Sequence, residues 1–397
     1  MVLVYLDLFL VIISFLIAGT SFRLIYLWIR SIKYSPRLTE KNVKVLHSAP
    51  KVSIIVPIRN EEKSIGNCID SLLNQDYPNF ELILVNDKST DRTPDILKQY
   101  SEREQKVRVV NLEYKPDNWI GKSWACLQGY LHSDGEILLF TDADTYHMKN
   151  TLRLAVQYLI GIKLDALSML PKMLAANFFV KVTLPFLTLY QHTYISPINI
   201  NDPSKKAVNY LAHFCMIKKT VYDQIGTHET VRDKFSEDLA IGEILKKGNF
   251  RMHMVRGELN LTTDTIRTPK LIFNQISRYI IPYFRENKLG AIVKTLSEFA
   301  ITFLPFLLLA YSILSTGLKL TFSLESILFL CNLVTVLNII IISSLQSKYV
   351  VYQNPWYGIA APVGACIFSF AFIIGLVKAI IKAPIGWRER EYDSTFK

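Results

Sequence analysis

Four strongly apolar stretches without a charged side chain constrain the fold of this 397-residue chain more than any other feature. They cover residues 8–22, 299–318, 326–347 and 356–377, whereas almost all charged residues lie in 30–298. About 20 apolar residues in a helix span the roughly 30 Å of hydrocarbon in a bilayer. One such stretch could be a buried core helix, but three in succession predict transmembrane helices in the C-terminal part of the chain.

The first apolar stretch is shorter, and the charges on its two sides differ. Asp7 precedes it, and four basic residues follow it: Arg23, Arg30, Lys33 and Arg37. A secretory signal peptide has basic residues before its apolar stretch and a cleavage site of small residues after it. The observed order instead predicts an uncleaved anchor and, by the positive-inside tendency, a following domain on the cytoplasmic side of the cell membrane.

The same tendency leaves the topology of the C-terminal part open. One anchor and three spans would place the tail outside the cell, yet that tail carries Arg388, Arg390 and Lys397. A re-entrant or interfacial course of one apolar stretch would remove the conflict.

Cysteine usage and net charge bear on the compartment and the partners. The five cysteines form no C-x-x-C pair, which predicts reduced and mostly buried thiols, not a disulfide framework or a zinc site. The net charge is +11, yet no basic run with interleaved aromatic residues resembles a nucleic-acid-binding module. We therefore expect no nucleic-acid partner; an anionic leaflet and diphosphate substrates explain the basic excess.

Short apolar runs alternate with helical patterns in the first half of the charged region. The runs resemble strands buried on both faces and cover 52–58, 80–85, 107–111 and 136–141. Helical spacing, or a proline suited to a first helical turn, predicts helices at 61–74, from Pro94 onward and at 122–132. This alternation predicts an α/β fold with a mainly parallel sheet and helices on both faces. Ligands of such sheets bind where strands end.

The strongest local signal is TDADT at 141–145, directly after an apolar run. Asp142 and Asp144 leave a buried strand two residues apart, so both carboxylates can face one hard cation that also binds phosphate oxygens and water. Two acids in a loop are more often solvated than bound to a cation. The position of this pair directly after an apolar strand favours the metal-binding interpretation.

Three further polar clusters occupy comparable places. They are Pro57-Ile58-Arg59-Asn60-Glu61 after the first strand, Asn86-Asp87-Lys88-Ser89-Thr90-Asp91 after the second, and Gly121-Lys122 at the third helix. A carboxylate after a strand can accept hydrogen bonds from a base or ribose, and Lys122 can add its charge to a helix N-terminus near phosphate. Helix caps in 89–91 and a surface position for Lys122 are the alternatives.

Two later helical patterns add the last candidates. Ser236 is placed as an N-cap, and Glu237 and Asp238 fall in a first turn, where the helix dipole favours negative charge. An acid there could also be a general base for a substrate hydroxyl. Three residues share one face of an amphipathic stretch that an ordinary interfacial helix would also explain: Gln275, Arg278 and Tyr279.

Taken in order, these clusters resemble the large inverting glycosyltransferase family 2, which has the GT-A fold. VSIIVPIRNEE, LILVNDKSTDRT, TDADT, SED and QISRY stand at the spacing of that family over roughly 50–285. The family's double aspartate is Asn86-Asp87 here, and Tyr279 replaces the tryptophan of its Q-x-x-R-W motif. The resemblance implies a Rossmann-like GT-A catalytic domain with attached transmembrane helices.

The resemblance also implies a single displacement with inversion. Asp144, aided by Asp142, would hold Mg²⁺ or Mn²⁺ on the diphosphate, and Asp238 would take the proton of the acceptor hydroxyl. Asp87 would bind the base, which we expect to be uracil. Further residues would line the nucleotide pocket (Pro57, Arg59 and Glu61) or lie near the diphosphate and acceptor (Lys122, Glu237, Gln275, Arg278 and Tyr279).

A narrower resemblance concerns the acceptor. NWIGKSWACLQGY at 118–130, GEILLFTDADT after it and the tail Trp387-Arg388-Glu389-Arg390-Glu391-Tyr392 resemble membrane glycosyltransferases associated with carotenoid acids and hopanoids. Ceramide glucosyltransferases share the overall plan. This likeness implies transfer of a sugar from a nucleotide sugar, expected to be a UDP-sugar, to a hydroxyl or carboxyl of a lipid acceptor.

Three alternatives stay open at the level of sequence. A polyprenyl-phosphate sugar synthase would need no base, because an acceptor phosphate attacks, and Glu237-Asp238 argues against it. A processive polysaccharide synthase is disfavoured by the few membrane helices and the altered Q-x-x-R-W. A non-catalytic membrane protein that binds nucleotide sugars or lipid is disfavoured by the intact Asp144 and Asp238.

The predicted domain organisation follows from these assignments. We expect a membrane anchor at 1–30, a GT-A catalytic domain at 50–255, an interfacial segment with the Q-x-x-R-Y motif at 256–297, transmembrane helices at 298–382 and a cytoplasmic or exposed basic tail at 383–397. Residues 174–200 fit an amphipathic segment on the membrane, a lid over an apolar acceptor or a plain packed helix. The whole would be a multi-pass protein of the cell membrane with a cytoplasmic catalytic domain.

Overall fold

The computed structural model describes residues 2–43, 49–264, 268–316, 323–387 and 390–392. The chain forms two compact units, each described here by itself. The helical unit comprises Met1–Lys33, Ala175–Tyr194 and Ile266–Ile385. The α/β unit comprises Tyr34–Leu174, Ile195–Thr265 and Gly386–Lys397.

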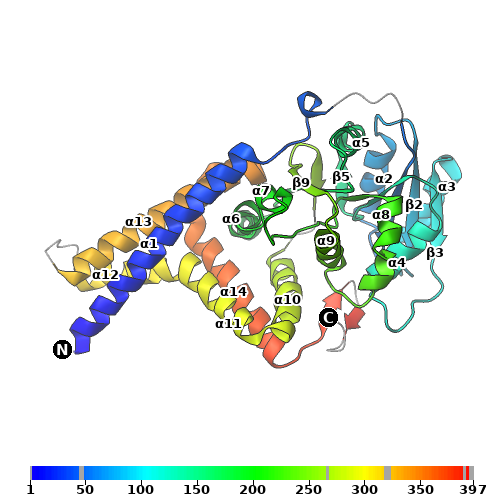
Figure 1. The fold of residues 1–397 in the computed structure, drawn as a ribbon. Helices are drawn as coiled ribbons and strands as arrows, with labels where there is room; N and C mark the ends of the chain where they lie inside the picture. The colour runs from blue at the N-terminus through cyan, green and yellow to red at the C-terminus, as the bar shows by residue number, and fades with distance from the viewer. Residues whose placement is uncertain (1, 44–48, 265–267, 317–322, 388–389, 393–397) are drawn as a thin grey trace. The chain divides into compact units, whose positions relative to one another are not determined.

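A seven-stranded sheet with the order β3-β2-β1-β4-β8-β6-β9 lies at the centre of the α/β unit (Figure 1). Its strands are β1 (Val52–Ile58), β2 (Phe80–Asn86), β3 (Val107–Asn111), β4 (Ile137–Phe140), β6 (Ala166–Leu170), β8 (Cys215–Lys218) and β9 (Met252–Arg256). Strand β1 is parallel to β2 and β4, and β2 is parallel to β3, whereas β8 is antiparallel to β4 and β6. The predicted α/β fold with a mainly parallel sheet is confirmed.

Helices cover both faces of this sheet. They are α2 (Ile65–Leu73), α3 (Thr93–Arg103) and α5 (Thr151–Gly161) on one face, and α4 (Gly121–Leu131), α8 (Lys219–Gln224) and α9 (Glu237–Lys247) on the other. Successive strand side chains point to opposite faces. Accordingly, Ile54 and Val56 join the core with α2, while Ile55 joins the core with α4.

Helix α4 packs unusually closely on β1. A Cβ atom at Gly129 would lie 2.3 Å from Cγ2 of Ile55, so a larger residue would push the helix away from the sheet. This contact holds the N-terminus of α4, and with it Lys122, at the sheet edge where β1 and β4 end.

Smaller elements complete the α/β unit. A second sheet has the order β5-β10-β7, and β11 pairs with β12 in a ribbon. The bounds are β5 (Thr145–His147), β7 (Lys172–Met173), β10 (Leu261–Thr263), β11 (Ile385–Trp387), β12 (Arg390–Tyr392), α7 (Pro197–Asn201), η1 (Glu40–Asn42) and η2 (Thr227–Val231).

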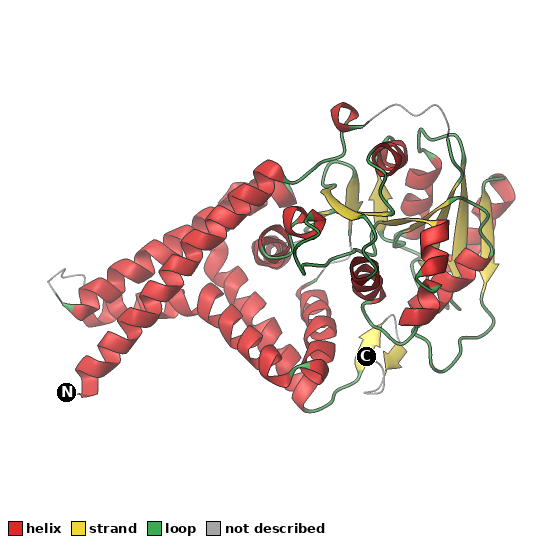
Figure 2. Cartoon of the chain, viewed as in Figure 1, coloured by secondary structure: helices red, strands yellow, loops and turns green. Residues whose placement is uncertain are grey.

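Long helices dominate the helical unit (Figure 2). They are α1 (Val2–Tyr34), α6 (Phe178–Thr193), α10 (Pro269–Glu286), α11 (Lys288–Thr302), α12 (Leu304–Thr316), α13 (Leu324–Gln346) and α14 (Ala361–Ile380), with the short turns η3 (Ser347–Val351) and η4 (Pro355–Ala360) between the last two. Three segments are long and apolar enough to cross a membrane: Asp7–Tyr34, Leu324–Val351 and Pro355–Ile380.

The apolar stretch at 299–318, which is long enough to cross a bilayer as one helix, is broken in the structure. Its described part lies across α11 and α12, which are bent by 47° and form either a broken span or a re-entrant loop. Pro305 explains the break, because proline lacks a backbone N–H and clashes with the carbonyl of the preceding turn. Residues 317 and 318 lie outside the described residues.

Two segments of the predicted domain organisation can be placed in the two units. Helix α6, which falls within the predicted bounds 50–255 and within the segment 174–200, lies in the helical unit. There it packs closely on α14, since a Cβ atom at Gly364 would lie 1.9 Å from the carbonyl oxygen of Val182. In the tail, predicted to be cytoplasmic or exposed, Tyr392 is buried and, together with Arg390, belongs to the α/β unit. Arg388, Glu389 and Lys397 lie outside the described residues.

Candidate active site

The loops after β1 and β2 are fastened to each other at the edge where both strands end. Arg59 donates from Nη1 to the carbonyl oxygens of Asp87 (2.7 Å) and Lys88 (3.0 Å). The side chain of Asn60 accepts a hydrogen bond from the backbone N–H of Thr90 at 2.8 Å. Asn60 and Lys88 have φ angles of 51° and 53°, a left-handed conformation that non-glycine residues adopt mostly at turns and functional sites.

The acids of these loops have different surroundings. Asp91 accepts from the backbone N–H groups of Thr93 (3.0 Å) and Glu62 (3.1 Å), so it ties the first residue of α3 to the loop after β1, whereas the N-cap position of α3 is Arg92. Glu61 is buried and accepts from the Ser64 hydroxyl at 2.7 Å. Both acids therefore help to shape the loops, and a role of Glu61 toward a nucleotide stays a prediction.

Asp87 forms a two-pronged ion pair that the sequence did not reveal. Its Oδ2 and Oδ1 accept from Nη1 and Nη2 of Arg390 at 2.5 and 2.9 Å. The Asp87 side chain is only 2% exposed in this arrangement. The signal that could have identified Arg390 was its place in the tail motif, but nothing in the motif indicates its partner.

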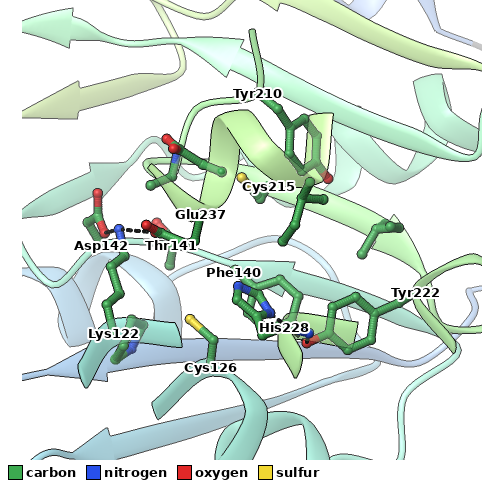
Figure 3. Close-up of a pocket in the computed structure, with 15 residues that line it drawn as sticks. Lys122, Cys126, Phe140, Thr141, Asp142, Tyr210, Cys215, Tyr222, His228 and Glu237 are labelled. Carbon is green, nitrogen blue, oxygen red and sulfur yellow. Dashed lines mark hydrogen bonds and ion pairs between the residues drawn. The ribbon is translucent and has the colours of Figure 1, made fainter. Parts of the chain in front are cut away.

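A pocket lies where β4, α4 and α9 come together (Figure 3). Nζ of Lys122 lies 2.7 Å from Oδ1 of Asp142 and 3.0 Å from Oε1 of Glu237. Burial opposes the charge of Lys122, but the two carboxylates outweigh it and hold the pKa of the ammonium well above its usual value. Lys122 is thus a fixed cation, not the surface residue of the alternative reading.

Asp238 lines the same pocket as the predicted base. Its Oδ2 accepts from the backbone N–H of Ala212 at 2.9 Å, and its Oδ1 accepts from the backbone N–H of Leu239 at 2.8 Å. Burial, followed by the charge of Glu237, raises the pKa of Asp238 to about 7. Ser236 occupies the predicted N-cap position of α9, with Glu237 and Asp238 in the first turn, although its side chain makes no capping hydrogen bond.

Other titratable groups of the pocket are poor bases or nucleophiles. The Tyr222 hydroxyl lies 2.6 Å from Nδ1 of His228, and burial lowers the pKa of His228 to about 3 (Figure 3). Burial raises the pKa of the Cys126 and Cys215 thiols well above its usual value, so neither is a reactive thiolate. Among these groups, Asp238 has the pKa that general-base catalysis near neutral pH requires. No sequence pattern pointed to Tyr222 or His228.

The TDADT segment follows β4, as predicted. The Thr141 hydroxyl donates to the carbonyl oxygen of His213 at 2.7 Å, which joins the end of β4 to the segment before β8. Asp142 then lines the pocket. Asp144 is buried, and its backbone carbonyl accepts from the N–H of Asp264 at 3.2 Å.

The charges at this edge of the sheet fit a divalent cation. Lys122 pairs with two carboxylates, Asp142 and Glu237, and Asp144 is a third acid two residues from Asp142. Within the described ranges no group of three or more His, Cys, Asp or Glu residues could hold a metal ion. Mg²⁺ and Mn²⁺ sites with phosphate ligands commonly need only one or two protein carboxylates, because phosphate oxygens and water complete the coordination.

The Q-x-x-R-Y residues lie on α10 of the helical unit. Ile272, Ile276 and Ile280 form the buried face of this helix, whereas Tyr279 is 39% exposed. The residues Gln275, Arg278 and Tyr279 thus belong to a different unit from the pocket, and their role toward diphosphate or acceptor stays a prediction.

The comparisons with known proteins agree with this geometry. The family model described as Glycosyl transferase family 2 matches residues 53–226. The chain carries a glycosyltransferase family 2 domain. This family 2 domain contains Lys122 and Asp142, and the segment with Glu237 and Asp238 follows it. The resemblance that the sequence motifs indicated is confirmed.

Two curated relatives are similar to part of the chain. The probable glycosyltransferase YdaM of Bacillus subtilis is 37% identical over 122 residues, which are 30% of this chain and 27% of that protein. The 4,4'-diaponeurosporenoate glycosyltransferase of Staphylococcus aureus is 28% identical over 209 residues, which are 52% of this chain and 53% of that protein. The chain thus matches about a quarter and about half of their lengths.

A solved structure supports the fold beyond the family 2 domain. The mannosyltransferase PcManGT from Pyrobaculum calidifontis, in complex with GDP-Man and Mn²⁺, has a TM-score of 0.55 and 16% sequence identity. The match covers 96% of this chain and 100% of that one. At this identity the likeness concerns the fold, and it confirms the predicted GT-A fold class.

Proposed function

We propose that this protein is a membrane glycosyltransferase that moves a sugar from a nucleotide sugar to a lipid acceptor. The meeting of Lys122, Asp142 and Asp238 in one pocket carries the proposal. A cation beside carboxylates suits a reaction in which a diphosphate leaves and an acceptor loses a proton. The names of the two curated relatives support the same class of reaction.

Asp238 is the proposed general base. With a hydroxyl acceptor, the oxygen would attack the anomeric carbon while its proton passes to the Asp238 carboxylate and the bond to the diphosphate oxygen breaks. A carboxyl acceptor is already ionised at neutral pH and would attack without giving up a proton. Attack from the side opposite the diphosphate inverts the anomeric centre. A pKa of about 7 leaves a large fraction of Asp238 ionised at neutral pH and makes it a stronger base than an ordinary aspartate.

The donor would lie across the ends of β1, β2 and β4. Asp87 would accept an N–H of the base, expected to be uracil, and Lys122 would meet the diphosphate. Residues Pro57, Arg59 and Glu61 would complete the nucleotide pocket, and Arg278, Gln275, Tyr279 and Glu237 the region of diphosphate and acceptor. Removal of one charge contact at Lys122 would also make donor binding less sensitive to salt.

Asp142 and Asp144 would hold Mg²⁺ or Mn²⁺ together with the diphosphate. When bound, the ion would neutralise negative charge on the departing diphosphate. The gathering of Asp142 and Glu237 around Lys122, with Asp144 two residues from Asp142, supports the assignment. A protein of the same fold was solved with GDP-Man and Mn²⁺.

A lipid acceptor agrees with the helical unit and with one relative. Three segments could cross a membrane by length and composition. The Staphylococcus aureus relative acts, by its name, on 4,4'-diaponeurosporenoate, a carotenoid acid. We therefore propose a hydroxyl or carboxyl of a hydrophobic acceptor, reached from a multi-pass protein whose catalytic domain faces the cytoplasm.

Release of nucleoside diphosphate by the detergent-solubilised protein tests the proposal. UDP-sugars and GDP-sugars would be screened with extracted membrane lipids and Mg²⁺ or Mn²⁺. We expect release with at least one donor, and loss of release in excess EDTA or with Asp144→Ala. The exposed acid Asp95 on α3 provides the control variant Asp95→Ala. Full activity in EDTA would contradict the metal role, and no release with any donor would contradict the function.

The polyprenyl-phosphate alternative makes a different prediction in the same assay. A phosphate acceptor attacks without losing a proton, so Asp238→Asn would leave its transfer nearly unchanged. Retained transfer to polyprenyl phosphate would therefore favour that alternative over a hydroxyl or carboxyl acceptor.

A further inference from the structure

We propose that the tail segment, residues 390–392, is part of the donor site, with Arg390 and Tyr392 as positioning residues for nucleotide binding. The inference rests on the proposed function and adds a segment that lies beyond the family 2 match at 53–226. It starts from the contacts of Arg390 and Tyr392 with segments that carry the site.

Arg390 holds the carboxylate assigned to the base. Both oxygens of Asp87 accept from its guanidinium, in the planar two-pronged geometry that arginine prefers with carboxylates. Arg59 donates to the backbone carbonyl oxygen of Asp87. Arg390 therefore orients the carboxylate, and Arg59 holds the backbone that carries it.

Tyr392 holds the beginning of the helix that carries Lys122. Its hydroxyl accepts from the backbone N–H of Gly121 at 3.0 Å, a group that has no partner within its own helix. Its ring packs edge-on against the ring of Phe235, with ring centroids 5.4 Å apart and an angle of 85° between the ring planes. Phe235 directly precedes Ser236 and the two acids of α9, so the tail segment touches three parts of the site.

The physical chemistry favours a role in binding over competition with the nucleotide. A nucleobase offers neutral N–H donors, which cannot replace the positive charge that a buried carboxylate needs. Each carboxylate oxygen has a second lone pair, so Asp87 can accept from Arg390 and from a base at once. The lining of the pocket with Lys122 and Asp238 includes neither Arg390 nor Tyr392.

Calorimetry with UDP and with GDP, each with Mn²⁺, tests this role without turnover. We expect Arg390→Ala to weaken UDP binding by about 10- to 100-fold, since hydrogen bonds to charged groups contribute strongly. Arg390→Lys keeps the charge but loses the planar fork, so it should restore only part of the affinity. Arg103→Ala removes an exposed arginine of the same unit on α3 and should bind UDP like the wild type.

A double-mutant cycle shows whether Arg390 acts through Asp87. If it does, Asp87→Ala and the double variant Asp87→Ala/Arg390→Ala should bind UDP equally, within about twofold. Tyr392→Phe keeps the ring against Phe235 and loses only the hydroxyl, so it should fold normally and weaken UDP binding about fivefold. In turnover assays both single tail variants should raise KM for the donor more than they lower kcat.

The outcomes separate the two proposals. Equal UDP binding by the wild type, Arg390→Ala and Tyr392→Phe would overturn the tail assignment and leave the glycosyltransferase proposal intact. Tighter binding by Arg390→Ala would also overturn it, because Arg390 would then compete with the nucleotide for Asp87. Failure of the wild type to bind either nucleotide would overturn both proposals.

Discussion

The two units differ in the buried polar contacts between their elements. In the described part of the helical unit, buried hydrogen bonds between helices join neutral groups, as in Asn332 with Ser14, Asn338 with Ser21 and Thr302 with Ser369, and the ion pair of Lys294 and Glu298 lies within α11. In the α/β unit, charged groups are buried: Lys122 with Asp142 and Glu237, Asp87 with Arg390, and Arg256 with Glu258. Neutral groups cost less to remove from water than charges do.

The charged clusters of the α/β unit also differ among themselves. Arg256 and Glu258 are almost fully buried and lie 2.8 Å apart. Lys122 contacts two carboxylates, and Asp238 lines the same pocket with a raised pKa. A fully buried ion pair suits a structural role, whereas several titratable groups with a perturbed pKa in a pocket suit binding and the transfer of a proton.

The largest expected effect concerns Asp238. Asp238→Asn keeps the shape of the side chain but cannot accept a proton, so turnover should fall by roughly 10²–10⁴-fold with UDP affinity nearly unchanged. Glu237→Gln should be milder. Steady-state kinetics and calorimetry on the same preparations measure both quantities. Near-normal transfer by Asp238→Asn to a hydroxyl acceptor would show that Asp238 is not the base. The pocket with Lys122 and Asp238 would then differ from a structural ion pair such as Arg256 with Glu258 in its contacts but not in its chemistry.

The stability of the cluster formed by Lys122, Asp142 and Glu237 should depend on the cation of Lys122. Lys122→Met removes the charge that lies 2.7 and 3.0 Å from the two carboxylates, and breaking such buried pairs should lower the free energy of unfolding by about 3 kcal/mol. Urea denaturation in detergent measures the change. The further change Glu237→Gln should recover part of the loss, and the exposed Lys98 gives the control Lys98→Met. A loss no larger than that of the control would show that the cluster is solvated.

The pH dependence sharpens the comparison within the pocket. Asp238 must be ionised to accept a proton, and its pKa is about 7. Below that pH, kcat/KM should therefore fall by about tenfold per pH unit, while above it the rate should level off. A pH–rate profile checks this, and the residual activity of Asp238→Asn should lack the acidic limb. A limb near pH 4 in the wild type would contradict the raised pKa.

The smallest effect is expected in the helical unit. Ser21→Ala leaves the Asn338 amide without the hydroxyl that it contacts at 2.9 Å, and such neutral bonds between helices contribute only about 1 kcal/mol. Thermal unfolding in detergent would be compared with Thr20→Ala, whose hydroxyl bonds only within its own helix. If Ser21→Ala lowered the stability as much as Lys122→Met does, buried neutral contacts and buried charged contacts would contribute equally, and the comparison of the two units would fail.

The strands could be predicted because their signals are local. Runs such as 52–58 and 107–111 are bounded as the structure has them, since a strand buried on both faces needs a short, continuous apolar run. The break at Pro305 could also have been predicted from proline alone. The place of α6 could not, because it depends on the approach of Val182 to Gly364, far away in the sequence.

The candidate site could be predicted only as separate clusters at strand ends. Asp142 and Asp238 were identified from motifs, but the contacts of Lys122 depend on how α4 and α9 pack on the sheet. The pair of Tyr222 and His228 carries no periodic or motif signal. Arg390 stood in a recognisable motif, yet only the folded chain shows that its partner is Asp87.

The pairing of Asp87 with Arg390 has a consequence for the timing of synthesis. The two residues are 303 positions apart, and α10 to α14 are translated between them. At 5–20 residues per second, Asp87 waits roughly 15 to 60 s on the ribosome for its partner. During this interval the Asp87 carboxylate lacks the Arg390 guanidinium as its partner. A newly made chain would thus gain its complete nucleotide site only after its last long apolar helix has been translated.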